Sequence, residues 1–182
     1  EQLNDQEFRF TNPQYLTHFN RNGYNNQPAF FSDNQIYISV QEKGMSQPDL
    51  YLLDLQNKSR ALVTQTPEGE YSPALSPDPY VFTAVRVENN RSQRLWQFPT
   101  DRLANGKPVF KYIDNVGYYH WLSGSRIALF MVGDPNYLAL ANVNTDQTQR
   151  VISNIGRCFQ TLPNGNLAFV HKVTDRTWYI KE

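Results

Sequence analysis

The sequence repeats itself at a spacing of 45 residues. Residues 28–37 (PAFFSDNQIY) align without a gap on residues 73–82 (PALSPDPYVF), and the same offset places residues 50–53 on residues 95–98. A register that holds through two strands and the loop between them indicates an internal repeat. A period of about 40–45 residues is typical of proteins built from stacked supersecondary units.

Two further copies, at residues 121–129 and 162–169, keep the same strand pattern. Each copy reads as short strands rich in aromatic and β-branched residues, separated by Pro, Gly, Asn and Asp turns. No segment shows a helical period. Four short strands in a repeat of this length form one blade of a propeller. We therefore predict an all-β protein, a β-propeller with four repeats of a four-stranded antiparallel blade.

The repeat also divides the chain, residues 1–182, which we interpret as one propeller domain or a portion of a propeller. The expected parts are an N-terminal strand at 14–18 and blades at 24–65, 69–113, 118–153 and 157–181. The second strands of the blades should be equivalent, and they are expected at Ile36–Val40, Val81–Val85, Ile127–Met131 and Leu167–Val170.

The two ends of the chain carry complementary strands. Residues 15–17 align with 62–64 at the end of the first copy, which predicts an outer strand without a blade of its own. Thr177–Lys181 is a third strand without an outer strand after it. In a complete ring these two would pair and remove exposed edges. In a portion of a longer ring they would lie apart.

Residues 25–37 (NNQPAFFSDNQIY) resemble the WD40-like repeat of TolB-type propellers, in which Asn is followed by Pro, an aromatic residue, Ser-Pro-Asp-Gly and an apolar strand. The second copy, with Ser76-Pro77-Asp78, is closer still, whereas the later copies lose the Pro and Asp. The resemblance implies a ring of six blades, of which four repeats would be a part. It also implies a periplasmic or secreted scaffold that docks protein partners. Related propellers gate prolyl-oligopeptidase-type peptidases, and a few carry lyase or glycosidase sites.

The composition argues against some classes of binding partner. Lysine plus arginine and aspartate plus glutamate both total 17 of 182 residues, so the formal net charge is zero, and no basic stripe is present. Nucleic acid is therefore not an expected partner. No apolar run approaches the ~20 residues of a transmembrane helix. The sequence begins at Glu1, as it would after removal of a signal peptide or after trimming, and we expect an exported protein.

No residue set has catalytic or metal-ligand spacing. The three histidines lie far apart, Cys158 has no motif around it, and no Gly-x-Ser-x-Gly nucleophile elbow is present. His120 aligns with the innermost strand, where it could face the central channel, although a hydrogen-bonded structural role is the simpler interpretation. Glu68 and Glu70 fall in a turn and are expected to be solvated. We expect no catalytic residue, metal or cofactor.

The connections at one mouth of the ring gather the residue types that dominate binding hot spots, tyrosine and arginine. The candidate binding residues are Tyr24, Tyr71, Tyr118, Tyr119, His120 and Arg157. Alternatively, the tyrosines pack where blades meet. The favoured function is a non-enzymatic scaffold that binds a protein or an extended ligand. The alternative is a propeller enzyme domain of lyase or glycosidase type, or the gating propeller of a peptidase.

Overall fold

The computed structural model describes residues 2–102 and 105–182, which form four antiparallel sheets and a small terminal hairpin. Blade one holds β3 (Tyr24–Ser32), β4 (Gln35–Gln41), β5 (Asp49–Asp54) and β6 (Ser59–Leu62). Blade two holds β7 (Gly69–Leu75), β8 (Val81–Val87), β9 (Gln93–Pro99) and β10 (Lys107–Pro108). Blade three holds β11 (Val116–Trp121), β12 (Arg126–Met131), β13 (Tyr137–Asn142) and β14 (Gln147–Ser153). Blade four holds β15 (Ile155–Thr161), β16 (Leu167–Thr174) and β17 (Thr177–Lys181).

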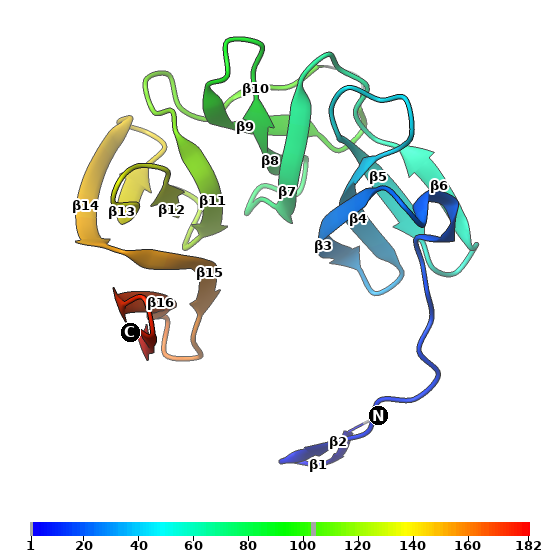
Figure 1. Cartoon of the computed structure of the whole chain (residues 1–182), viewed down its shortest axis with the longest axis horizontal. Helices are drawn as coiled ribbons and strands as arrows, with labels where there is room; N and C mark the ends of the chain where they lie inside the picture. The colour runs from blue at the N-terminus through cyan, green and yellow to red at the C-terminus, as the bar shows by residue number, and fades with distance from the viewer. Residues whose placement is uncertain (1, 103–104) are drawn as a thin grey trace.

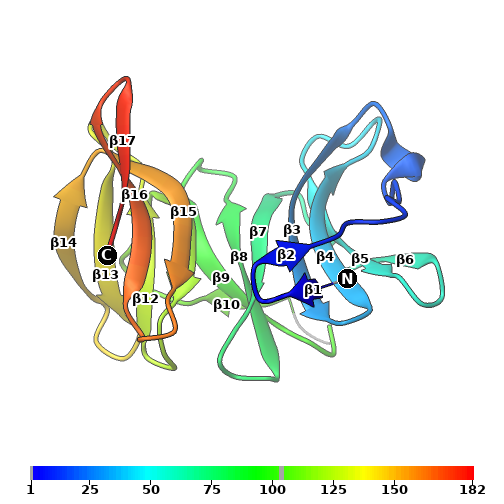
Figure 2. The ribbon, with the colours of Figure 1, turned by 90° about the horizontal axis from the view of Figure 1, so that it is seen from below.

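The blades follow one another around a common centre, with the first strand of each blade on the inner side (Figure 1). Within every blade, neighbours in sequence are neighbours in the sheet, and Figure 2 shows the sheets side by side. The four equivalent strands predicted from the repeat are the second strands β4, β8, β12 and β16. The predicted all-β propeller of antiparallel blades is confirmed. The first strands begin at residues 24, 69, 116 and 155, at most two residues from the expected starts.

The predicted strand at 14–18 is wrong. These residues form a loop and turn that lead into the short helix η1 (His18–Asn20), and β17 pairs with β16 and not with this segment. The side-chain amide of Asn20 donates to the carbonyls of Tyr24 and Gln41 at 3.1 and 3.0 Å. Phe19 packs on the outward face of blade one. These contacts hold the segment against blade one.

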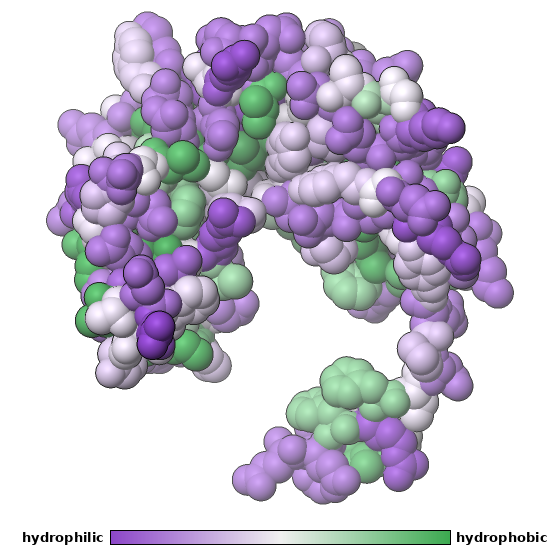
Figure 3. All heavy atoms as spheres, in the orientation of Figure 1, coloured by the Kyte–Doolittle hydropathy of each residue, from purple (hydrophilic) through white to green (hydrophobic). Residues whose placement is uncertain are grey.

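Before this turn, β1 (Gln2–Asn4) and β2 (Glu7–Phe8) form a hairpin that stands away from the blades (Figure 1). Phe8 and Phe10 of this N-terminal segment are 59% and 95% exposed, and Figure 3 shows apolar surface there. In the described residues, no helix reaches the length and hydropathy that crossing a bilayer requires.

Three of the four apolar clusters in the described residues lie between blades, and the fourth lies on the face of blade one that Phe19 covers. Between blades one and two, Phe82 sits edge-on to Tyr37 at 5.2 Å and stacked with Phe98 at 5.2 Å between ring centroids. A second cluster joins blades two and three around Leu95, and a third joins blades three and four around Ile155. Since a sheet of this kind has two faces to cover, each blade needs its neighbour in order to fold.

We predict that Phe82→Ala lowers the free energy of unfolding by about 3–5 kcal/mol, because it removes a ring that is 1% exposed and leaves a cavity between two blades. The measurement is urea denaturation followed by circular dichroism. Phe30→Ala, which truncates a ring that is 66% exposed, is the control and should change stability by less than about 0.5 kcal/mol. Equal losses in the two variants would contradict this location of the core.

Candidate functional site

Tyrosines from three successive inner strands line one pocket. Tyr24 of β3, Tyr71 of β7 and Tyr118 of β11 contribute to a cavity of about 530 Å³, which Arg157 of β15 completes. All four blades therefore supply a residue from the same end of their inner strands. Four of the six residues predicted for binding meet at this site, which we call the tyrosine pocket.

A repeated backbone feature shapes the inner strands next to the pocket. Gln27 and Ser72 lie 45 residues apart and both adopt left-handed backbone angles, with φ of 55° and 52°. The pairing register of β3 and β7 shifts at these residues, which is the mark of a β-bulge. A proline, Pro28 or Pro73, follows each of them. Since proline has no N–H, the interrupted ladder leaves no backbone donor unpaired at these positions.

Two half-buried amide side chains of the pocket, those of Gln27 and Asn136, accept hydrogen bonds that join neighbouring blades. The Gln27 side-chain oxygen accepts from the backbone N–H of Ser72 at 3.1 Å, which ties blade one to blade two. The Asn136 side-chain oxygen accepts from the backbone N–H of Ile155 at 2.9 Å, which ties blade three to blade four. Because the oxygen of each amide is occupied, the group that remains available to a ligand is the NH₂ group, which is a donor.

The ionisable groups that line the pocket are tyrosine hydroxyls, which are neutral, and one arginine, which is positively charged. Burial raises the pKa of Tyr24, an effect that outweighs a hydrogen bond with Asn26, and burial likewise raises the pKa of Tyr71. Both hydroxyls therefore stay protonated at neutral pH. The Arg157 guanidinium lies 5.6 Å from the centre of the Tyr118 ring. Among the described residues, no carboxylate forms an ion pair with it.

Tyr24 and Tyr71 also make an inter-blade contact, as the alternative interpretation expects, whereas Tyr118 contacts Phe130 of its own blade. Tyr24 meets Tyr71 edge-on at 6.2 Å between ring centroids, and Tyr118 meets Phe130 at 5.8 Å. The three side chains are half-buried. Each ring thus packs with one part of its surface and lines the pocket with another.

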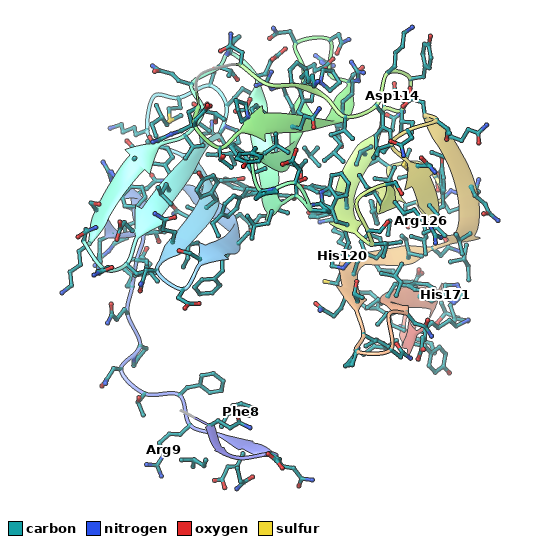
Figure 4. All side chains as sticks on the ribbon, turned by 180° about the vertical axis from the view of Figure 1, so that it is seen from behind. Phe8, Arg9, Asp114, His120, Arg126 and His171 are labelled. Atoms are coloured by element: carbon teal, nitrogen blue, oxygen red, sulfur yellow. The ribbon has the colours of Figure 1, made fainter. Side chains whose placement is uncertain are left out.

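Tyr119 and His120 lie outside the tyrosine pocket. Tyr119 points from β11 toward blade two, where its hydroxyl donates to the carbonyl of Ser72 at 3.0 Å and burial raises its pKa. His120 is half-buried and hydrogen-bonds to the hydroxyl of Thr161 in blade four at 2.8 Å, and burial lowers its pKa. Figure 4 shows His120 near the inner side of the blades and His171 farther along blade four. Successive residues of a strand face opposite sides, which separates Tyr119 from its two neighbours.

Within residues 2–102 and 105–182, no group of three or more His, Cys, Asp or Glu side chains could hold a metal ion. Cys158 is an exposed free thiol.

The expectation that Glu68 and Glu70 are solvated is wrong for Glu70, which is fully buried between blades one and two. The Nε of Arg86 lies 2.9 Å from the Glu70 carboxylate, and an Nη of the same guanidinium lies 3.3 Å from that of Glu68. The guanidinium also stacks 4.0 Å from the centre of the Trp96 ring. An arginine inside the apolar strand 81–87 (VFTAVRV) is the signal in the sequence that a buried counter-charge exists.

Asp49 of blade one belongs to the same cluster. The Thr64 hydroxyl lies 3.2 Å from Asp49 and 3.0 Å from Glu70, yet it carries only one hydrogen. A proton on one of the two carboxyl groups supplies the missing donor. Burial raises the pKa of both, and that of Glu70 rises to about 7, although Thr66 and Arg86 oppose the shift.

The fold is shared with solved propellers of low sequence identity. TolB from Acinetobacter baumannii superposes with a TM-score of 0.63 at 17% identity, over 83% of this chain and 38% of TolB. An oligogalacturonate lyase from Vibrio parahaemolyticus gives 0.58 at 11% identity, over 86% and 49%. The propeller domain of the Trilobed protease from Pyrococcus furiosus gives 0.53 at 11% identity, over 87% and 52%.

The chain therefore spans about half the length of these structures or less. It matches no protein-family model and no curated protein sequence. The likeness shows a β-propeller fold that this chain shares with TolB, an oligogalacturonate lyase and a protease propeller domain.

We predict that stability falls as pH rises between about 4.5, the ordinary pKa of glutamic acid, and about 7, that of Glu70 in the fold. In this window the folded chain retains a proton that the unfolded chain releases, so each pH unit costs up to about 1.4 kcal/mol per proton. Glu70→Gln should flatten the slope, with a remainder from Asp49. Urea denaturation at several pH values measures it. The exposed Glu7→Gln is the control, and an unchanged slope in Glu70→Gln would contradict the assignment.

Proposed function

We propose that this chain is a non-enzymatic propeller scaffold that binds an extended segment of a protein partner in the tyrosine pocket. The observation that carries the proposal is the convergence of Tyr24, Tyr71, Tyr118 and Arg157, one residue from each blade, on a single cavity. Tyrosine and arginine are enriched among residues that dominate binding energy.

The physical properties of the pocket suit binding. A tyrosine ring offers a large contact area and has only two side-chain torsions to immobilise, so it loses little conformational entropy when a ligand binds. The contacts of Tyr24 with Tyr71 and of Tyr118 with Phe130 already restrict the three rings. Part of the entropic cost of ordering the site is therefore met when the blades assemble.

The side chains at the pocket also favour binding over catalysis. The described lining contains no carboxylate, histidine, cysteine or lysine, the groups that most often serve as general bases, general acids or nucleophiles. The phenols of Tyr24 and Tyr71 have pKa values raised away from neutrality. The proposal accordingly assigns no catalytic residue, metal or cofactor.

We further propose that the protein is exported and acts in the periplasm or outside the cell. The resemblance of residues 25–37 to the TolB-type repeat supports this location. The shared fold with TolB supports a role in contacts between proteins, since fold analogy of this kind indicates a class of function rather than a partner.

The test is a selection of displayed random peptides on the immobilised chain, followed by calorimetric titration of the selected peptides. Tyr24→Ala and Tyr71→Ala should each weaken binding about tenfold or more, the loss expected for a hot-spot side chain. The matched control is Tyr80→Ala, because Tyr80 is 78% exposed and lies beyond the opposite end of β7. Circular dichroism checks that all three variants remain folded.

Equal weakening by Tyr80→Ala, or selected peptides that bind both pocket variants as tightly as the original chain, would place the binding site elsewhere. Turnover of peptide or glycoside substrates by the purified chain would contradict the non-enzymatic assignment.

A further inference from the structure

The tyrosine pocket presents hydrogen-bond donors. The oxygens of Gln27 and Asn136 are occupied by backbone N–H groups, and their NH₂ groups have no partner among the described residues. The Arg157 guanidinium has only donors to offer. The hydroxyls of the tyrosines and the amide of Gln93, which also lines the pocket, can both donate and accept. A ligand that satisfies this set must supply acceptors.

The charge of the pocket points the same way. Arg157 is the only charged residue in the described lining, so no fixed negative charge opposes its own. Hydrogen bonds between a guanidinium and an anion are about twice as strong as neutral ones, and a carboxylate accepts two of them side by side. The complementary group is therefore a carboxylate.

The apolar part of the lining indicates which kind of molecule bears this group. Val85, Phe130 and Val132 contribute to the same cavity as Arg157. A peptide can place an aliphatic side chain on this surface and a carboxylate beside the cation. A sugar chain has no aliphatic side chain with which to cover Val85 and Val132.

We propose that the tyrosine pocket selects peptide segments with an aspartate or glutamate side chain, which pairs with Arg157 and with the amides of Gln27 and Asn136. This inference rests on the proposed function, since it names the chemistry of the ligand that the pocket binds. Peptides selected on the chain should be enriched in acidic residues. Replacing the selected Glu by Gln in a synthetic peptide with an amidated C-terminus should weaken binding about tenfold or more.

Two variants test the charge pairing. Arg157→Gln should make the Glu and Gln forms of the peptide bind equally, because it removes the cation and keeps an exposed polar side chain. Asn136→Asp should disfavour the acidic form, since the new carboxylate still accepts from the N–H of Ile155 but repels the ligand. The control is Arg126→Gln, another exposed arginine, at the start of β12 (Figure 4). It should leave the preference unchanged.

The outcomes separate the two proposals. Peptides that require Tyr24 and Tyr71 but bind equally well with Glu or Gln would overturn the acidic preference and leave the binding site standing. A preference that follows only a free C-terminal carboxylate would overturn the side-chain assignment. If no peptide is selected while trigalacturonate binds in an Arg157-dependent manner, the occupant is an acidic sugar and the peptide assignment fails. If neither binds, both proposals fail.

Discussion

The structure depends on the burial of blade faces against one another. A sheet of four short strands has two apolar faces and no interior of its own, so core residues of one blade pack against those of the next. Phe82 illustrates this, because its ring lies among Phe31 and Tyr37 of blade one and Phe98 of its own blade. Three of the described apolar clusters consequently lie between two sheets. The mouth of the inner strands, and the pocket in it, is fixed by how these faces meet.

The same interface explains how a charged cluster and a binding pocket lie next to each other in the sequence. Glu70 and Tyr71 are consecutive residues of β7, and successive side chains of a strand leave on opposite sides. Glu70 is directed to Arg86 and to Thr64 of blade one, where it is fully buried. Tyr71 is directed to the pocket. The Glu70–Arg86 pair lies within blade two. The hydroxyls of Thr64 and Ser39, by contrast, reach Glu70 from blade one, and these directional bonds favour one alignment of the two blades.

Features that recur with the repeat could be predicted from the sequence, whereas contacts that occur in one blade only could not. A gapless offset of 45 residues located the second strands of blades one and two, the recurring strand pattern located those of blades three and four, and strand direction brought Tyr24, Tyr71 and Tyr118 to one mouth. The strand expected at 14–18 did not form, because the side-chain bonds of Asn20 connect residues that no repeat pattern relates. Glu70 was missed for a similar reason. From the sequence, a carboxyl group between two repeats is expected to be solvated, but in the fold the neighbouring blade covers it.

The bond from the Ser72 N–H to the side chain of Gln27 joins two bulges that are equivalent in the repeat but belong to different blades. The Gln27 amide both joins blade one to blade two and offers its NH₂ group to the pocket. A separated blade therefore cannot form the site. Ligand binding thus depends on the contact between the two blades and not on either sheet alone. Local separation of blade one from blade two would release the Gln27 amide while both sheets kept their strands, so ligand affinity would fall before any measure of secondary structure changed.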